Sequence, residues 1–555
     1  MLFAAAVRRR SQLLAAGRHY RRLAQRWPFL PHLCVFTVSG LVAIFLQSTP
    51  TFADPDSFYH ARMATLVRDR GVFTTFPWLQ FTVLNDRFTD HQFLYHLAVI
   101  PFVTAWPPLV GLKLATVVFF ACAVTAFFAL LGRFGVRGAW FPTAVLLVSS
   151  PFLFRANLAK AQALAFTLLF IFLGTLTARQ PVPTAVVSFA YVWLYGGWPL
   201  LPVLAGLYLL ASVVRPLPSP RRWLVGLLRR VQRVSSGHGL TALATVGGVV
   251  GGLVFNPYFP HNIGFYWNQV VQIAVIGYRG TIGVGAEWYP FAPLELLAAS
   301  SIATFAAAVG ATIFVLTVRR QSPTSVFLLL ATSLFYGLTW RSRRNVEYLI
   351  PFALLFTAMS IHHGVSGLPW RQFARELATF FREQKLFFAA AVLPLVFTPY
   401  IVVRDVVSTR AAYAQGIPFT AYAAASAWLV SHSPPGALVF HSDWDDFPVL
   451  FYHNTHNRYV VGLDPTFMYR FDPVRYWQWE RVTTGRERVK LYDVIANRFG
   501  ARYVLVGSEQ SAMGKLVAKN PGFREVYHDQ EARIFAVLPP PEFPNSKRQI
   551  PNNTQ

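Results

Sequence analysis

The sequence predicts a polytopic α-helical membrane protein of about eleven spans, followed by a small extracytoplasmic α/β domain. Hydrophobic residues make up 54% of the 555 residues and charged residues only 13%, where a soluble domain has roughly a quarter charged. Residues 1–403 hold 33 Lys and Arg against 10 Asp and Glu, a net +23, whereas residues 404–555 hold 17 against 14, a net +3. This composition excludes a soluble nucleic-acid-binding protein, which needs a charged surface, and its 16% of aromatic residues excludes a disordered chain.

Eleven apolar runs predict the spanning helices, because a span needs about 20 mostly apolar residues. A further short run, 93–106, predicts a helix lying on the outer surface, and 182–195 is the shortest of the eleven. Both cysteines, Cys34 and Cys122, lie in apolar runs, which excludes a disulfide framework or a cysteine-based zinc site. The predicted spans are 28–47, 110–131, 139–154, 161–178, 182–195, 198–214, 239–256, 294–317, 324–340, 345–362 and 386–403.

The positive-inside rule predicts the orientation. With the arginine-rich N-terminus in the cytoplasm, every cytoplasmic loop is basic, and the odd number of spans puts the C-terminal domain outside. No small-residue cleavage site follows the first apolar run, so we do not expect a cleaved signal peptide. The cytoplasmic cations are Arg8, Arg9, Arg10, Arg18, Arg21, Arg22 and Arg26; Arg133 and Arg137; Arg179; Arg215, Arg221, Arg222, Arg229, Arg230 and Arg233; Arg319 and Arg320; and Arg371, Arg375, Arg382 and Lys385.

The acidic residues of the first 362 positions follow the same topology. All eight fall in or at the edge of predicted extracytoplasmic segments, although the positive-inside rule does not require this. Acidic groups at a membrane are costly and tend to mark function, so their confinement to one face predicts chemistry there. They are Asp54, Asp56, Asp69, Asp86, Asp90, Glu287, Glu295 and Glu347.

The first outer loop, 48–92, carries paired carboxylates just beyond the first span. Asp54 and Asp56 flank Pro55, and oxygen ligands of this kind suit Mg²⁺ or Mn²⁺. The alternative is that Asp56 or Ser57 caps the helix that follows. Further along this loop, Asp90 and His91 are either additional ligands or anchors for the surface helix that starts at Gln92.

The long outer loop, 256–293, contains three glycines near its single carboxylate, Glu287. Glycine-rich loops of this length are often lids, and a lid carrying Glu287 would close over a substrate and bring an anionic ligand to a metal. The alternative is that Trp288 and Tyr289 are interfacial anchors and Glu287 is solvated.

Three arginines, Arg341, Arg343 and Arg344, lie between two spans on the outer side, where the positive-inside rule leaves few cations. Arginine is well suited to phosphate, so we expect them to bind a lipid-linked phosphate or pyrophosphate, or else anionic lipid headgroups. Arg155 and Lys160, in another outer loop, serve either purpose.

The C-terminal region, 404–545, reads as mixed α/β, with a Pro- and Asn-rich tail (546–555) expected to be disordered. Strands are predicted at 437–440, 458–461, 503–506 and 534–537, with helices at 419–432 and 488–499. Trp444 and Asp445 follow the first strand in the segment HSDWDDF, which is either a binding loop or a turn rich in Asp.

These motifs resemble those of the oligosaccharyltransferase catalytic subunit family, within the C-type membrane glycosyltransferases. The segment DSFYHAR (56–62) is similar to the family's Asp-containing first loop, VGAEWYP (284–290) to its lid with Glu287 in the Glu position, one outer arginine to its phosphate-binding arginine, and SDWDDF (442–447) to its Trp-Trp-Asp motif. The register of the first motif makes Asp56, rather than Asp54, the metal ligand that the resemblance implies, with Glu287 in the family's Glu position. Together with the loop carboxylates, we expect Asp56, Glu287 and Asp54 to be catalytic and a divalent cation to be held by Asp56, Glu287, Asp90 and His91. The resemblance also implies an acceptor site at Trp444 and Asp445.

Two departures from the family pattern are visible. The outer loop after the third span, FRANLAKAQ (154–162), has no carboxylate where the family has a second acidic motif. Either Asp86, Asp90 or His91 replaces those ligands, or Lys160 supplies the positive charge in place of a metal. In the Trp-Trp-Asp motif, only Trp444 and Asp445 match.

The resemblance implies an inverting glycosyltransferase in a bacterial or archaeal plasma membrane. It would move a sugar from a polyprenyl-phosphate or -pyrophosphate donor to a protein, glycan or lipid acceptor outside the cell, with residues 1–403 as the transferase domain and loops 48–109 and 256–293 as its catalytic part. The alternatives are a transporter or flippase of a lipid-linked substrate, and a scaffolding subunit. The sequence leaves the sugar, the acceptor and the oligomeric state open.

Overall fold

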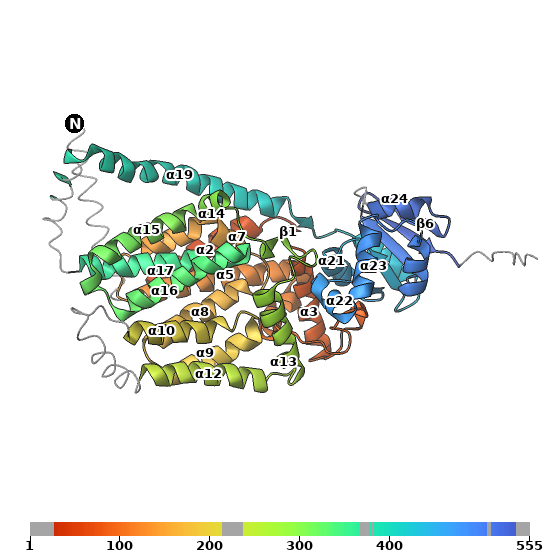
Figure 1. Ribbon diagram of the computed structural model, residues 1–555, viewed down its shortest axis with the longest axis horizontal. Helices are drawn as coiled ribbons and strands as arrows, with labels where there is room; N and C mark the ends of the chain where they lie inside the picture. Colours follow the sequence, from red (N-terminus) through yellow and green to blue (C-terminus); the bar gives the residue numbers. More distant parts are fainter. Residues whose placement is uncertain are drawn as a thin grey trace, which may run out of the picture. The chain divides into compact units, whose positions relative to one another are not determined.

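The computed structural model describes residues 27–213, 237–366, 375, 378–379, 382–507 and 512–539, without the side chains of 386–398. The chain divides into two compact units (Figure 1). Unit 1 comprises residues 1–72 and 89–419, and unit 2 comprises residues 73–88 and 420–555. The division after Phe419 lies beyond the boundary at 403 expected from the sequence, and part of the first outer loop, 73–88, belongs to unit 2.

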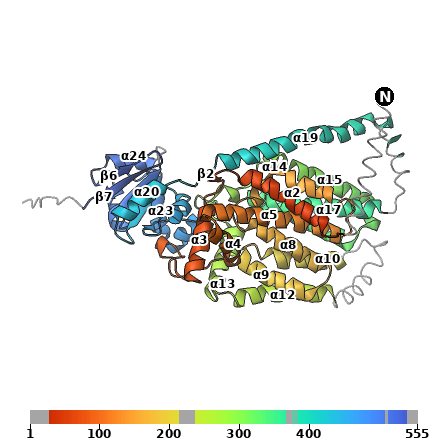
Figure 2. The same cartoon turned by 180° about the vertical axis from the view of Figure 1, so that it is seen from behind.

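Unit 1 is a bundle of apolar helices (Figures 1 and 2). Its helices are α2 (Leu30–Gln47), α3 (Asp56–Arg70), α4 (Phe93–Ala105), α5 (Pro108–Arg133), α6 (Trp140–Val148), α7 (Ser150–Ala156), α8 (Gln162–Thr177), α9 (Pro181–Leu194), α10 (Leu200–Val213), α12 (His238–Val254), α13 (His261–Tyr266), η3 (Trp267–Ile276), η4 (Ala286–Trp288), α14 (Pro293–Ala299), α15 (Ser301–Leu316), η5 (Val318–Arg320), α16 (Pro323–Arg341), η6 (Arg343–Asn345), α17 (Val346–Val365) and α19 (Lys385–Ala414).

Each apolar run predicted to span the membrane is helical at its predicted place. Within the described residues, four helices are long and apolar enough to cross a membrane: α2, α5, α16, and η6 with α17. The pair α14 and α15, bent by 88°, makes a fifth if it counts as one span. The apolar helices α4, α8, α9, α10 and α12 are shorter, with 10–17 residues each, so the number of eleven spans stays a prediction.

Close helix contacts depend on small residues, as is usual between apolar helices. Helices α9 and α12 pack side by side, and a Cβ on Gly248 of α12 would fall on the backbone of Ala185 in α9. The neighbouring Gly247 faces open space. Gly248 therefore allows these two helices to approach.

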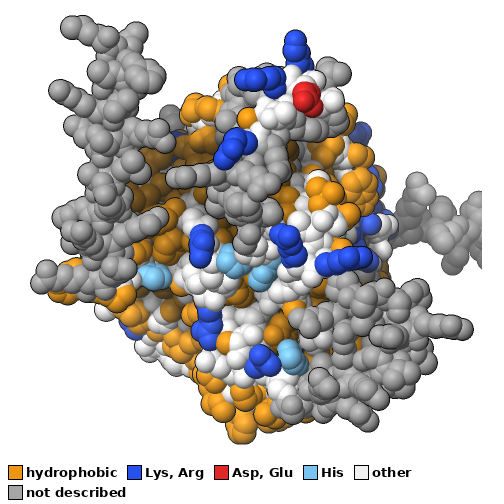
Figure 3. All heavy atoms as spheres, turned by 90° about the vertical axis from the view of Figure 1, so that its left-hand side faces the viewer, with side chains coloured by type: hydrophobic (Ala, Val, Ile, Leu, Met, Phe, Trp, Pro, Cys, Tyr) orange, Lys and Arg blue, Asp and Glu red, His pale blue; other side chains and the backbone are white. Residues whose placement is uncertain are grey.

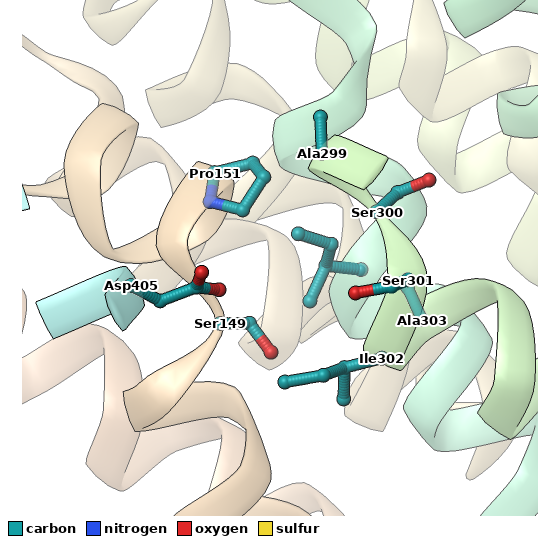
Figure 4. A pocket seen from close by; sticks show the side chains of 9 residues that line it. Ser149, Pro151, Ala299, Ser300, Ser301, Ile302, Ala303 and Asp405 are labelled. Atoms are coloured by element: carbon teal, nitrogen blue, oxygen red, sulfur yellow. The ribbon is translucent and has the colours of Figure 1, made fainter. Parts of the chain in front are cut away.

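Two breaks in the helices face each other inside unit 1 (Figure 4). Ser149 separates α6 from α7, and Ser300 separates α14 from α15. The buried carboxylate of Asp405, on α19, lies beside the break at Ser149 and accepts a hydrogen bond from the Ser150 backbone N–H at 3.3 Å. The Asp405 carboxylate thus satisfies one backbone N–H group at the break between α6 and α7.

Exposed arginines gather at one end of unit 1, where Figure 3 shows Lys and Arg predominating over acidic side chains. Arg133 at the end of α5 donates to Gln180 Oε1 at 3.1 Å, and Arg320 donates to the Gly364 carbonyl at the end of α17. Several predicted cytoplasmic cations, namely Arg8–Arg26, Arg215–Arg233 and Arg371, lie outside the described residues.

A five-stranded sheet of order β4-β3-β5-β7-β6 forms the centre of unit 2. β3 pairs in parallel with β4 and β5, whereas β7 is antiparallel to both β5 and β6. The sequence prediction missed β6, and the tail from residue 540 lies outside the described residues. The elements are η1 (Pro77–Leu79), α20 (Ala423–His432), β3 (Leu438–His441), α21 (Asp446–His453), β4 (Arg458–Tyr459), α22 (Pro465–Phe471), α23 (Pro473–Thr483), η7 (Asp493–Arg498), β5 (Tyr503–Gly507), α24 (Ala512–Lys519), β6 (Phe523–His528) and β7 (Ala532–Val537).

Candidate active site

The paired carboxylates of the first outer loop lie at the start of α3. The preceding strand β1 (Thr51–Phe52) is fixed by antiparallel pairing with β2 (Ile417–Pro418). Asp54 Oδ1 accepts the backbone N–H of Asp56 at 2.9 Å, which orients both carboxylates. The alternative that Asp56 or Ser57 caps α3 is wrong, because Pro55 is at the N-cap and no side chain caps the helix there.

The ammonium group of Lys160 lies between these two carboxylates. Lys160 Nζ is 2.7 Å from Asp54 Oδ1 and 2.7 Å from Asp56 Oδ2. The lysine comes from the turn between α7 and α8. All residues from Ala156 to Ala163 except Lys160 itself are buried. Packing therefore holds the lysine backbone in place, so the side chain is oriented by its surroundings as well as by its partners.

Glu287, in the short helix η4 of the long outer loop, enters the same cluster. Its two oxygens accept from different arginines, Arg155 Nη1 at 2.8 Å and Arg344 Nη1 at 3.5 Å. Its backbone carbonyl accepts from Ser342 Oγ at 2.8 Å. These contacts bring Glu287 into the cluster, and the role of its loop as a lid stays a prediction.

Arg155 bridges Glu287 to a second carboxylate, that of Glu347 in the first turn of α17. Arg155 Nε is 2.8 Å from Glu347 Oε2, and the Glu347 side chain is fully buried (0% exposed). Sequence reasoning counted Glu347 only among the outer acidic residues and gave Arg155 no partner. The sequence signal for this pair was weak. It consisted of one carboxylate at the edge of a span, which needs a cation nearby but does not indicate which one.

The three outer arginines separate in the structure. Arg344 joins the cluster: its guanidinium lies over Trp288 at 5.1 Å and 3.4 Å from the Tyr195 hydroxyl. Arg343 pairs with Glu295 at 2.9 Å instead, and Arg341 donates to the Val275 carbonyl. Arg344 is thus the arginine of this set that contacts Glu287.

Asp90 and His91 have other partners. The buried Asp90 accepts the backbone N–H of Gln92 at 3.0 Å and contacts His96 Nδ1 at 2.6 Å, which anchors the start of α4. The His91 ring stacks on Phe265, and burial lowers the pKa of His91 to about 4. Both contacts correspond to the anchoring alternative considered for this segment.

The charges of the cluster act on one another. Enclosure raises the pKa of Asp56, Lys160 lowers it, and the carboxylates of Asp54 and Glu287 raise it again; the net direction is upward. Enclosure opposes the charge on Glu287, but Arg344, Arg155 and Lys160 together hold its pKa well below the usual range. Asp56, Lys160 and Glu287 are therefore close enough to form one electrostatic site.

Comparisons with solved structures show which fold this is. Archaeal oligosaccharyltransferase AglB from Archaeoglobus fulgidus, solved with an inhibitory peptide and a dolichol-phosphate, matches with TM-score 0.58 and 14% identity over 96% of this chain and 75% of that chain. ArnT from Cupriavidus metallidurans, bound to undecaprenyl phosphate, matches with TM-score 0.53 and 15% identity over 91% and 97%. Arabinofuranosyltransferase AftD from mycobacteria matches with TM-score 0.53 and 14% identity over 92% and 40%.

The chain shares its fold with AglB, ArnT and AftD. The resemblance seen in the sequence motifs is thereby confirmed at the level of fold. No protein-family model matches the sequence, and no curated protein matches it.

A divalent cation does not fit the carboxylates of this chain as they are arranged. Among the residues that the structure describes, no three His, Cys, Asp or Glu side chains form a group that could hold a metal ion. The facing oxygens of Asp54 and Asp56 already contact the Lys160 ammonium, and Glu287 contacts two arginines. The expected set of Asp56, Glu287, Asp90 and His91 is not assembled.

Trp444 and Asp445 lie in unit 2, in the turn between β3 and α21. Asp443 Oδ1 accepts the backbone N–H of Asp445 at 3.1 Å, the geometry of an Asp-centred turn. Asp446, which follows, accepts a hydrogen bond from the Tyr422 hydroxyl at 3.0 Å. The turn alternative thus describes the local structure, and an acceptor-binding role for Trp444 and Asp445 stays a prediction.

Proposed function

We propose that this protein is a membrane glycosyltransferase that moves a sugar or oligosaccharide from a polyprenyl-phosphate or -pyrophosphate donor to an acceptor outside the cytoplasm. The observation that carries the proposal is the cluster in which Asp56, Glu287 and Arg344 meet, although they are far apart in the sequence. Its support from comparison is the fold shared with AglB and ArnT, which were solved with dolichol-phosphate and undecaprenyl phosphate.

Arg344 is the group we assign to the donor phosphate. Its contacts with Glu287 (3.5 Å) and with Tyr195 (3.4 Å) are long for hydrogen bonds, so a phosphate oxygen can replace them. The Arg344 side chain is 31% exposed. Arg155 is the poorer candidate, because the buried Glu347 holds it from the other side.

Asp56 is the carboxylate we assign to the acceptor. Its side chain is 34% exposed, and Lys160 contacts one of its two oxygens. In the proposed reaction, Asp56 accepts the proton of the acceptor as the acceptor atom bonds to the anomeric carbon. The bond from that carbon to the phosphate oxygen breaks at the same time, so the configuration inverts and the phosphate leaves with both bonding electrons.

A large apolar cavity suits the lipid part of such a donor. About 1060 Å³ of space lies between α6, α15, α17 and α19, and most of its lining is apolar, including Phe141, Val145, Phe305 and Leu354. An isoprenoid chain has no polar groups, so it would enter such a space without leaving a polar group unsatisfied. The cavity therefore supports a lipid-linked substrate rather than a free nucleotide sugar.

The first test is comparative mass spectrometry of glycoproteins and glycolipids from cells with and without the gene. We expect one class of glycan to disappear, which would also identify the sugar and acceptor. An unchanged glycan profile would contradict the proposal.

The second test uses the purified protein in lipid nanodiscs with the donor identified in this way. We expect Asp56→Asn, Glu287→Gln and Arg344→Lys each to lower the transfer rate by about 10²–10⁴-fold, since each removes a charge or geometry that the reaction uses. Glu295→Gln is the matched control, because Glu295 pairs with Arg343 outside the cluster. Equal effects of Glu287→Gln and Glu295→Gln would refute the assignment.

One observation favours a transporter or flippase as a second candidate. Broken helices beside a buried acidic residue are common at transport sites, and Asp405 lies beside the two breaks of Figure 4. The two functions differ in outcome: a flippase moves an intact lipid-linked sugar across reconstituted vesicles, whereas a transferase separates the sugar from its lipid.

A further inference from the structure

The position between Asp54 and Asp56 is filled by a cation of the chain itself. Lys160 Nζ lies 2.7 Å from an oxygen of each carboxylate, a normal distance for charge-assisted hydrogen bonds. A magnesium ion bound by the same oxygens would need them about 2.0–2.1 Å away and in a near-octahedral arrangement. The lysine and a metal ion therefore cannot occupy this position together.

The surroundings keep the lysine charged and in place. Burial alone would lower the pKa of Lys160, but Asp54, Asp56 and Glu287 outweigh that effect and raise it. The turn that carries it is anchored at both ends: Gln47 Nε2 donates to the Asn157 carbonyl at 2.6 Å, and Ala165 N–H donates to the Ala161 carbonyl at 2.9 Å. A lysine held in this way acts as a fixed positive charge.

The charge balance of the cluster is consistent with this arrangement. Three cations, Lys160, Arg155 and Arg344, face four carboxylates, Asp54, Asp56, Glu287 and Glu347. A divalent ion accompanied by one more carboxylate ligand would contribute a net charge of +1, the same as Lys160 alone. A metal added to the present set would instead carry two more positive charges into a site that is already nearly neutral.

We propose that Lys160 permanently replaces a divalent cation in this protein, and that removing its ammonium group turns Asp54 and Asp56 into a divalent-cation site. This inference deepens the proposed function, because Lys160 would then supply the positive charge beside the acceptor carboxylate. Two of its three N–H donors point to Asp54 and Asp56, and the third remains for a substrate oxygen.

Metal binding is the primary readout, because it needs no substrate. Purified full-length protein in nanodiscs is titrated with Mn²⁺, and free Mn²⁺ is followed by electron paramagnetic resonance. We expect the wild type to show no specific Mn²⁺ binding. The apparent Mn²⁺ affinity of Lys160→Ala should be at least about tenfold higher than the weak, nonspecific affinity of the wild type. The double variant with Lys160→Ala and Asp56→Asn should lose this binding, because one carboxylate is gone.

Two controls keep the experiment decisive. Lys113→Ala removes another enclosed lysine, which contacts the backbone carbonyls of Gln47 and Thr49 and lies over the rings of Phe52 and Phe419. Among the described residues it pairs with no carboxylate, so this variant should create no Mn²⁺ site. Lys160→Ser is the second variant, used if Lys160→Ala does not elute as a folded monodisperse species. A folded Lys160 variant without tighter Mn²⁺ binding would overturn the inference, and so would specific Mn²⁺ binding by the wild type.

A separate arm uses the transfer reaction. The wild-type rate should change less than about twofold when EDTA is added, because an ammonium group cannot be chelated. Abolition by EDTA with recovery on Mn²⁺ would overturn the inference while upholding the proposed function. If no transfer occurs at all, the proposed function fails, and the binding arms still decide the role of Lys160.

Discussion

Replacing Arg155 with Met tests how strongly unit 1 depends on compensation of its buried Glu347 carboxylate. Arg155 Nε contacts Glu347 Oε2 at 2.8 Å, and the Glu347 side chain is fully buried, with 0% exposed. The other oxygen, Oε1, is buried without a hydrogen-bond partner among the residues that the structure describes. Arg155→Met would therefore leave a buried carboxylate without its ion-pair partner.

The magnitude follows from this burial. Removing one partner of a buried ion pair costs about 3–5 kcal/mol of stability, because the remaining charge is uncompensated. Glu287, the other partner of Arg155, is 34% exposed and also contacts Arg344, so its share is about 1 kcal/mol or less. We therefore expect Arg155→Met to destabilise the protein by about 3–5 kcal/mol, mostly through Glu347.

A double-mutant cycle with Glu347→Gln measures how much of this loss of stability comes from the Arg155–Glu347 pair. Neutralising Glu347 removes the charge that Arg155 compensates, so the double variant should regain about 1–3 kcal/mol relative to Arg155→Met alone. The assay is equilibrium unfolding of the purified protein in mixed detergent micelles, followed by tryptophan fluorescence. An Arg155→Met variant as stable as the wild type, or a cycle with no coupling, would refute the reasoning.

Two further predictions concern packing and pH. In unit 1, Gly248→Ala should destabilise the contact of α12 with α9, because its Cβ would meet the Ala185 backbone. We expect a loss of about 1–3 kcal/mol in the same unfolding assay. Gly247→Ala is the control, since a Cβ there would face open space. In unit 2, enclosure and the nearby Asp443 carboxylate raise the pKa of Asp446 to about 7, above its unfolded value of about 4. The folded state then binds this proton more tightly, so stability should fall as the pH rises from about 4 to about 7. Hydrogen exchange of peptides covering β3 and α21 in the full-length protein should show this decline, and Asp446→Asn should flatten it; protection that increases over this range would contradict the assignment.

Helix positions could be predicted from sequence because the bilayer imposes a local rule. A run of about 20 apolar residues, or somewhat fewer, is readable without knowledge of the rest of the chain, and every such run is helical in the structure. The breaks at Ser149 and Ser300 were not predicted, since each is marked only by a pair of serines inside an otherwise apolar run. The sequence analysis also assigned 73–88 to the outer loop of the transferase domain, because nothing local indicates that this segment belongs to unit 2.

The candidate site divides in the same way. Charge placement in loops follows topology, so eight acidic residues could be assigned from sequence to one side of the predicted membrane. The loop motifs and the family resemblance then pointed to Asp54, Asp56 and Glu287 among them. Their partners depend on packing between distant segments: Lys160 meets Asp56 across 104 positions, and Arg155 meets Glu347 across 192. The sequence left Lys160 and a metal ion as alternatives, and considered three outer arginines equally.

The amino-acid sequence by itself determined the helical class of this protein, because burial of apolar runs is a property of each run. It also predicted that the acidic residues of the first 362 positions lie on one face of the membrane, and that placement stays a prediction. Only the tertiary structure decided that Lys160 lies between Asp54 and Asp56 and that Arg344, rather than Arg341 or Arg343, contacts Glu287. The physical reason is range: ion pairs form over about 3–4 Å, and no local pattern records which distant side chains the fold brings that close.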